Sequence, residues 1–283
     1  MNNIRIWSPL SKVDPQKYLY HYTSISKAMK ILYYETLRFS PITNTNDIFE
    51  QKPKLMFDDS IYDDPELLKA EKNIENYFQE NRNRVKILCF SRDNQSVNTN
   101  NSLTKDMQLA NVIGRGFALL RMRAQYAENN EGVCLIINMK KLISKLNAEG
   151  FKFIDKKVNY FSSYSSFKIN AQEITELSKS IDNKVTDVMA DLICNNSKYV
   201  KYNYFYKLND WATENEYRII ILTNEDNSVK IPKIFDFIEG IVIGNNTKEE
   251  DSYIIKKIVN EKCPKLSVRR IVFDSMITTI QEL

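Results

Sequence analysis

The stretch Lys17-Tyr18-Leu19-Tyr20-His21-Tyr22-Thr23-Ser24 opens the first ordered unit of the chain. Its alternating pattern up to Tyr22 predicts a β-strand. Thr23 or Ser24 can cap a helix that follows, because their side-chain oxygens accept hydrogen bonds from the first free backbone N–H groups. Apolar residues then recur at helical spacing over residues 25–32, which predicts an amphipathic helix.

Further strands and helices follow without strict alternation. The expected strands cover residues 37–40, 85–91, 133–137, 152–160, 219–222, 238–243 and 268–273. The expected helices cover residues 66–82, 105–128, 139–146, 170–206 and 248–261. This order predicts an α+β fold rather than a doubly wound sheet. We expect one α+β domain over residues 1–283, with a mostly helical insertion around residues 166–206.

Composition narrows the class of protein. The chain has 283 residues, 43% of them apolar, and a net charge of +4. No apolar run is long enough for a membrane helix, and the N-terminal residues lack a signal-peptide pattern, so we expect a cytoplasmic protein without a membrane partner. One histidine and four scattered cysteines argue against a structural zinc site and favour buried free thiols. The mild charge permits an anionic ligand without requiring nucleic acid.

The strongest local signal for chemistry is Glu214-Asn215-Glu216, directly before an apolar strand. On an extended backbone, residues i and i+2 point the same way, so both carboxylates are expected to project together. Lys207 and Arg218 lie near enough in sequence to compensate their charge. Such a pair suits acid–base chemistry or binding of sugar hydroxyls, and a solvated ion pair at a strand entry is the alternative.

His21 is the only histidine, and it stands just before a capped helix, where backbone N–H groups favour anionic ligands. A hydrogen-bonded, half-buried histidine is the alternative. Asn46-Asp47-Ile48-Phe49-Glu50 is a compact polar segment that either lines a site or holds its own loop through Asx-type bonds. The arginines of the expected helix over residues 105–128 bind phosphate or lie on its solvated surface.

The order of these motifs resembles a bacterial domain-of-unknown-function family, number twenty-nine seventy-one. The resemblance rests on YHYTS, NDxFE, CFS, QYAENNEGVCL, K…WATENEYR (with the lysine at Lys207) and EGIVIG, and spans about Tyr18 to Ile271. Two positions depart from the pattern. Arg123 stands where that family often has a tryptophan, which removes an expected stacking surface, and Ile48 stands where proline is common.

The layout also resembles, more remotely, the ADP-ribosyltransferase superfamily. That resemblance implies a central mixed or antiparallel sheet of this type with flanking helices, and NAD as the substrate without a metal. It implies that Glu216 and Glu214 are catalytic: Glu216 stabilises an oxocarbenium-like transition state, and Glu214 orients or deprotonates the acceptor. It implies that the residues binding NAD are His21, Tyr22, Thr23, Phe90, Ser91, Tyr126 and Arg218.

The leading hypothesis is therefore an NAD-dependent ADP-ribosyltransferase-like protein. Its partners are NAD or a related nucleotide and a protein or nucleic-acid acceptor, and the resemblance implies a bacterial toxin or phage-defence effector. One alternative is a non-catalytic module that binds a nucleotide or a protein. Another is a hydrolase that uses Glu214 and Glu216 on a nucleotide or glycosidic bond.

Overall fold

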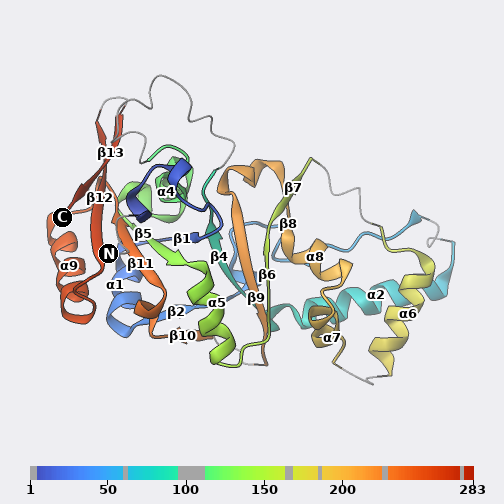
Figure 1. Ribbon diagram of the computed structural model, residues 1–283. Coiled ribbons are helices and arrows are strands. Elements are labelled where there is room, and N and C mark those ends of the chain that lie inside the picture. The colour runs from blue at the N-terminus through green and yellow to red at the C-terminus, as the bar shows by residue number, and fades with distance from the viewer. Residues whose placement is uncertain are drawn as a thin grey trace.

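A mixed β-sheet forms the centre of the computed structural model (Figure 1). The structure describes residues 5–59, 63–94, 112–162, 168–183, 187–224, 229–274 and 277–283. Eight of the described strands run in the spatial order β13-β12-β11-β5-β1-β4-β9-β6, and β3 adds to β4. The pairs within this sheet are antiparallel apart from β11 with β12, which the crossover helix α9 joins in parallel.

The strands of this sheet are β1 (Tyr18–Thr23), β3 (Ser40–Pro41), β4 (Val85–Ser91), β5 (Val133–Asn138), β6 (Phe153–Lys157), β9 (Glu216–Leu222), β11 (Ile238–Ile243), β12 (Ser267–Asp274) and β13 (Ile277–Glu282). Two small ribbons pair β2 (Thr36–Arg38) with β10 (Lys230–Pro232) and β7 (Asn159–Phe161) with β8 (Tyr206–Leu208). The α-helices are α1 (Ile25–Tyr34), α2 (Pro65–Glu80), α4 (Leu120–Tyr126), α5 (Met139–Ala148), α6 (Ala171–Asp182), α7 (Val188–Cys194), α8 (Lys198–Phe205) and α9 (Glu249–Lys262). The predicted α+β class, with a central mixed sheet and flanking helices, is confirmed.

Helices cover both faces of the sheet. On the first face, α1, α5 and α9 pack against the apolar residues of the central strands in one large core. On the second face, residues 6–13 and α4 cover one half, around β1 and β5. The other half, around β4 and β9, is covered by α2, α6, α7 and α8, which lie together at the right of Figure 1. The second face therefore has two separate apolar clusters.

The space between these two clusters coincides with a break in the strand ladder. β1 and β4 are neighbours in the sheet, yet they pair only at Tyr20 with Ser91. By contrast, β4 pairs with β9 over seven residue pairs, from Val85 to Ser91. The sheet thus separates after Tyr20, and this opening is where the candidate site lies.

The strand and the helix that open the chain are confirmed, whereas the strand expected over residues 37–40 is divided between β2, which pairs with β10, and β3, which pairs with β4. The helix α1 begins after Ser24, whose side chain accepts a hydrogen bond from the backbone N–H of Lys27. It ends at Tyr34, and the following residue, Glu35, adopts the left-handed conformation at φ 53°. Ser24 rather than Thr23 is therefore the cap, and Thr23 is the last residue of β1.

Three further sequence expectations are corrected. The long helix expected over residues 105–128 does not exist over residues 112–119, where Gly114 has a positive φ of 72° and a 3-10 turn precedes the short α4; residues 105–111 lie outside the described part. The single strand expected over residues 152–160 is two strands, since β6 pairs with β9 and β7 with β8. Of the four free cysteines only Cys134 is fully buried, and Cys194 is exposed.

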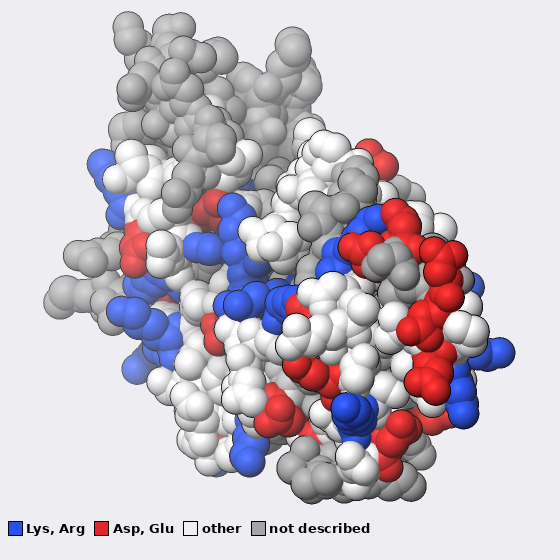
Figure 2. Space-filling view, turned by 90° about the vertical axis from the view of Figure 1, so that its right-hand side faces the viewer, with Lys and Arg blue, Asp and Glu red and all other residues white. Residues whose placement is uncertain are grey.

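Surface charge of both signs lies on the face that carries the α2 and α6 helices. In Figure 2, acidic side chains gather toward the right of this face and basic side chains toward the left. Among the described helices, none has both the length and the apolar character needed to cross a membrane.

Candidate active site

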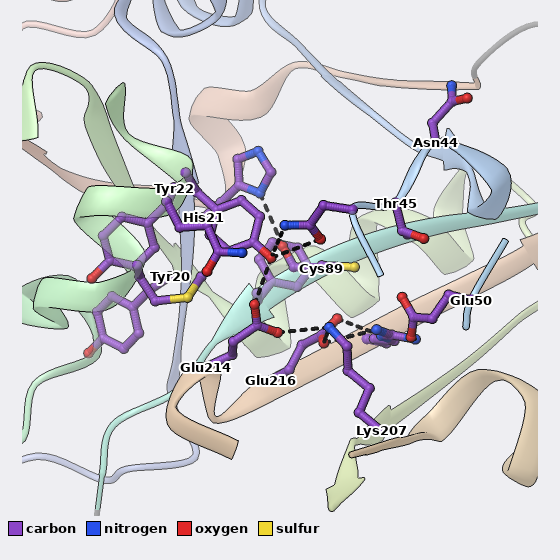
Figure 3. A pocket seen from close by; sticks show the side chains of 16 residues that line it. Tyr20, His21, Tyr22, Asn44, Thr45, Glu50, Cys89, Lys207, Glu214 and Glu216 are labelled. Atoms are coloured by element: carbon purple, nitrogen blue, oxygen red, sulfur yellow. Dashed lines mark hydrogen bonds and ion pairs between the residues drawn. The ribbon is translucent and has the colours of Figure 1, made fainter. Parts of the chain in front are cut away.

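A cavity of about 350 Å³ opens where β1 separates from β4, on the second face of the sheet. Strands, the α4 helix and the loop after β3 all contribute to its walls. The lining residues are Tyr20, His21, Tyr22, Asn44, Thr45, Asn46, Glu50, Cys89, Phe90, Met122, Gln125, Tyr126, Lys207, Glu214, Glu216 and Arg218. Figure 3 shows His21 on one side of this pocket and the two glutamates with Lys207 on the other.

Beyond the pair of Tyr20 with Ser91, the side chain of His21, rather than a backbone group of β1, contacts β4. Its Nδ1 lies 3.1 Å from the backbone oxygen of Cys89, and because a carbonyl only accepts, Nδ1 carries the hydrogen. Burial lowers the pKa of His21 below its usual range, although the hydrogen bond to Cys89 opposes this shift. The imidazole is therefore neutral near pH 7, and its Nε2 is a hydrogen-bond acceptor.

The backbone conformation that directs the two glutamates into the pocket differs from the one predicted from the sequence. Glu214 is the last residue of a 3-10 helix, Asn215 has the left-handed conformation at φ 45°, and Glu216 begins β9. The expected extended backbone across all three residues is therefore wrong. The side-chain amide of Asn215 stabilises this turn by donating to the backbone oxygens of Arg92 and Asp93.

Lys207 and Arg218 neutralise the two carboxylates, as expected from their positions in the sequence. Lys207 Nζ donates to Glu214 Oε2 at 2.8 Å and to Glu216 Oε2 at 3.1 Å. Arg218 makes a bidentate pair with Glu216, with Nη2 lying 2.9 Å from Oε2 and Nε 2.5 Å from Oε1. These four residues are only 1% to 4% exposed, so their ion pairs are almost free of solvent screening.

The environment separates the two carboxyl groups in acidity. Burial raises the pKa of Glu216, but the charges of Arg218 and Lys207 outweigh it and hold the pKa well below its usual range. For Glu214 burial is the larger effect, and its pKa is raised despite Lys207. Glu216 is thus a fixed anion, and Glu214 is the carboxyl group that exchanges a proton more readily near neutral pH.

The segment Asn46–Glu50 both lines the pocket and holds its own loop. Asp47 accepts a hydrogen bond from the backbone N–H of Phe49, which is the expected Asx-type bond. Asn46 and Glu50 face the pocket, and Glu50 Oε1 lies 2.5 Å from Arg218 Nη1. The loop therefore contacts the charged groups around Glu216. Both alternatives left open by the sequence, lining a site and holding the loop together, are observed.

The pocket brings together seven of the nine residues named from the sequence. Both glutamates, His21, Tyr22, Phe90, Tyr126 and Arg218 line it. Thr23 and Ser91 are buried and are not among the lining residues; Ser91 faces Tyr20 and Glu216 across the ladder. Sequence reasoning did not name Glu50, Lys207 or Asn46 as binding or catalytic residues, although each lies within a motif that it had singled out.

Two arginines considered for phosphate binding have structural roles instead. Arg115 is buried in an ion pair with Asp93, at 3.1 Å between Nε and Oδ1. Arg123 is buried and donates to the backbone oxygen of Phe117. Within the described ranges, no cluster of three or more His, Cys, Asp or Glu side chains is arranged to hold a metal ion.

Comparison with known proteins supports part of the resemblance seen in the sequence. No curated protein and no solved structure matches the chain. One family model, described as "Protein of unknown function (DUF2971)", matches residues 122–219, about a third of the chain. That segment runs from α4 into β9 and contains Tyr126, Lys207, both glutamates and Arg218, so one wall of the pocket is similar to this family of unknown function.

Proposed function

We propose that the protein is an NAD-dependent ADP-ribosyltransferase-like enzyme whose acceptor is a protein or a nucleic acid. One observation carries the proposal: His21 and the pair Glu214 and Glu216 line a single cavity at a break in the sheet. The sequence had required these residues to share one ligand, although they are almost 200 positions apart. Aromatic side chains of Tyr22 and Phe90 in the same cavity offer surfaces for flat rings.

The chemistry of the proposal follows from the charges. The neutral His21 accepts a hydrogen bond from a ribose hydroxyl through Nε2. Glu216 is held as an anion, so it stabilises positive charge that develops on the ribose when the bond to nicotinamide breaks. Glu214, with its raised pKa, accepts the proton that the acceptor nucleophile loses. Water as the acceptor would make the same site an NAD glycohydrolase.

One feature favours a second candidate, a non-catalytic module that binds a nucleotide or a protein. Both carboxylate oxygens of Glu216 are already bonded, Oε1 to Arg218 and Oε2 to Arg218 and Lys207. A ribose hydroxyl must therefore compete with, or add to, these bonds. A hydrolase acting on another nucleotide or a glycosidic bond would use the same pair and differ in its substrate.

Release of nicotinamide from NAD tests the transferase proposal. We expect release by the wild type, a loss of at least about 100-fold in Glu216→Gln, and unchanged release in Glu239→Gln, whose carboxylate binds Asn138 and Lys141 outside the pocket. Circular dichroism establishes that each variant is folded, because Glu216→Gln also breaks buried ion pairs.

The outcomes separate the candidates. Stabilisation by NAD without release, following RT ln(1 + [L]/Kd), would favour the binding module. If NAD is neither cleaved nor able to stabilise the protein, both the transferase proposal and an NAD-binding module are refuted. As a toxin or phage-defence effector, the wild type expressed in bacteria is expected to slow growth, and Glu216→Gln is expected to be tolerated.

A further inference from the structure

Tyr126 contacts the carboxyl group that the proposed function makes the proton acceptor. Its hydroxyl lies 2.6 Å from Glu214 Oε1, while Lys207 binds the other oxygen of the same carboxylate. Tyr126 comes from α4 and is only half-buried, so this hydrogen bond is close to the mouth of the pocket. Glu214 is therefore held from two sides, by a cation and by a neutral donor.

The hydroxyl of Tyr126 is itself oriented by the loop before Glu50. Asn46 Nδ2 lies 3.1 Å from the Tyr126 oxygen, and Asn46 Oδ1 lies 3.2 Å from it. The hydroxyl has one hydrogen, and the shorter contact with a charged acceptor directs that hydrogen to Glu214. The amide of Asn46 then donates to the free lone pair of the hydroxyl, which fixes its direction.

Several charged and titratable groups face Glu214 from the elements packed against it. They are Lys207 on β8, Glu216 on β9, Tyr160 on β7 and Tyr126 on α4. Burial raises the pKa of Glu214 and Glu216 adds to this rise, whereas Lys207 and the hydrogen bond from Tyr126 lower it. Removing the Tyr126 hydroxyl therefore shifts Glu214 in a known direction.

We propose that Tyr126 is a positioning residue for Glu214 and that Asn46 fixes the direction of the Tyr126 hydroxyl. The geometry itself does not depend on the reaction, but the catalytic meaning of this contact rests on the proposed function. Tyr126 thereby joins the loop that contains Asn46 and Glu50 to the carboxyl group at the pocket mouth.

The first test measures thermal unfolding of wild type, Tyr126→Phe and Asn46→Ala between pH 4 and pH 8. The folded-state pKa of Glu214 is raised above its unfolded value, so its contribution to stability is present at low pH and is lost as pH rises through the folded pKa. Tyr126→Phe removes a hydrogen bond that lowers that pKa, so the pKa rises further and the deficit in stability against wild type grows from pH 4 to pH 7. Asn46→Ala produces the same trend with a smaller amplitude.

The matched control is Tyr77→Phe, which removes another partly buried tyrosine hydroxyl, one that accepts from the backbone N–H of Met189 rather than donating to a carboxylate. Its deficit is expected to stay constant with pH over the same interval. A Tyr126→Phe deficit as flat as that of the control would overturn the proposal, because a merely structural hydroxyl moves no carboxyl titration.

The second test is the pH profile of nicotinamide release from NAD. In Tyr126→Phe the acid midpoint of kcat/KM is expected to move up by about one pH unit, since Glu214 must be ionised to accept a proton. A midpoint that does not move, in an active variant, overturns the positioning role. If the wild type has no turnover, the proposed function fails, and the unfolding experiment alone decides whether Tyr126 controls Glu214.

Discussion

Lys207→Met offers the most direct test of the buried charge network. The ammonium group is the shared partner of Glu214 and Glu216, and the residue is 2% exposed. Removing one partner of a buried ion pair costs about 3–5 kcal/mol of folding free energy. Methionine keeps most of the side-chain volume, so the loss reports charge rather than a cavity.

The size of the effect converts to a melting temperature. An unfolding entropy of about 2.1 cal/mol/K per residue gives about 0.6 kcal/mol/K for 283 residues, so we expect Tm to fall by about 5–8 °C at pH 7. Differential scanning calorimetry measures it. Lys141→Met is the control, because the Lys141 side chain is more than half exposed and its pair with Glu239 is screened by solvent.

The pH dependence makes the test specific. Burial raises the pKa of both Glu214 and Glu216, and Lys207 opposes that rise, so both pKa values increase in Lys207→Met. Glu214, whose folded pKa is already raised, stabilises the folded state at low pH and loses that contribution as pH rises through its folded pKa, whereas the charge of Arg218 keeps the pKa of Glu216 low. The deficit is therefore largest near neutrality and narrows toward pH 4. A deficit below about 1 kcal/mol, or one equal at all pH values, would refute the network as described.

Three other changes probe the surrounding structure. A histidine with a lowered folded pKa stabilises the protein above its unfolded pKa and loses this effect as pH falls. In His21→Gln the free energy of unfolding should therefore fall less between about pH 7 and pH 5 than in wild type, as measured by urea unfolding at each pH. Gly132→Ala should cost about 3 kcal/mol by chemical denaturation, since a Cβ would lie 2.4 Å from the backbone oxygen of Thr23, and full stability would contradict that packing. Asn215→Ala should cost about 2 kcal/mol through its lost hydrogen bonds and its left-handed backbone, and Asn215→Gly should cost less.

Local signals in the sequence predicted the elements that depend on local physics. The unit around Ser24 has both a capping side chain and a helical apolar pattern, so strand and helix were found at nearly their observed bounds. The strand Val85–Ser91 was found because it contains the apolar run Ile87-Leu88-Cys89-Phe90, which is mostly buried on both faces of the sheet. Where the conformation depends on distant partners, as for β6 and β7, the same kind of pattern gave one strand instead of two.

The residues of the candidate site could be predicted from the sequence, but the contacts between them could not. The ExE motif, His21 and the NDxFE segment stand out in composition, and all three contribute to the pocket. The break between β1 and β4 has no sequence signal, because it arises when the His21 side chain, rather than the backbone, bonds to Cys89. The contact between Glu50 and Arg218 likewise joins positions more than 160 residues apart.

The position of the buried charges is itself an argument for function. An ion-paired cluster such as Lys207, Arg218, Glu214 and Glu216 is often less stable than apolar residues of the same volume would be. Here it occupies the gap between two well-packed apolar clusters, at the point where the ladder between β1 and β4 stops. The Oγ atom of Ser91 on the adjoining rung is buried and has no hydrogen-bond partner among the described residues. Departures from good packing and pairing are expected where a protein binds or transforms a ligand, and in the described structure they coincide with the cavity that joins His21 to the two glutamates.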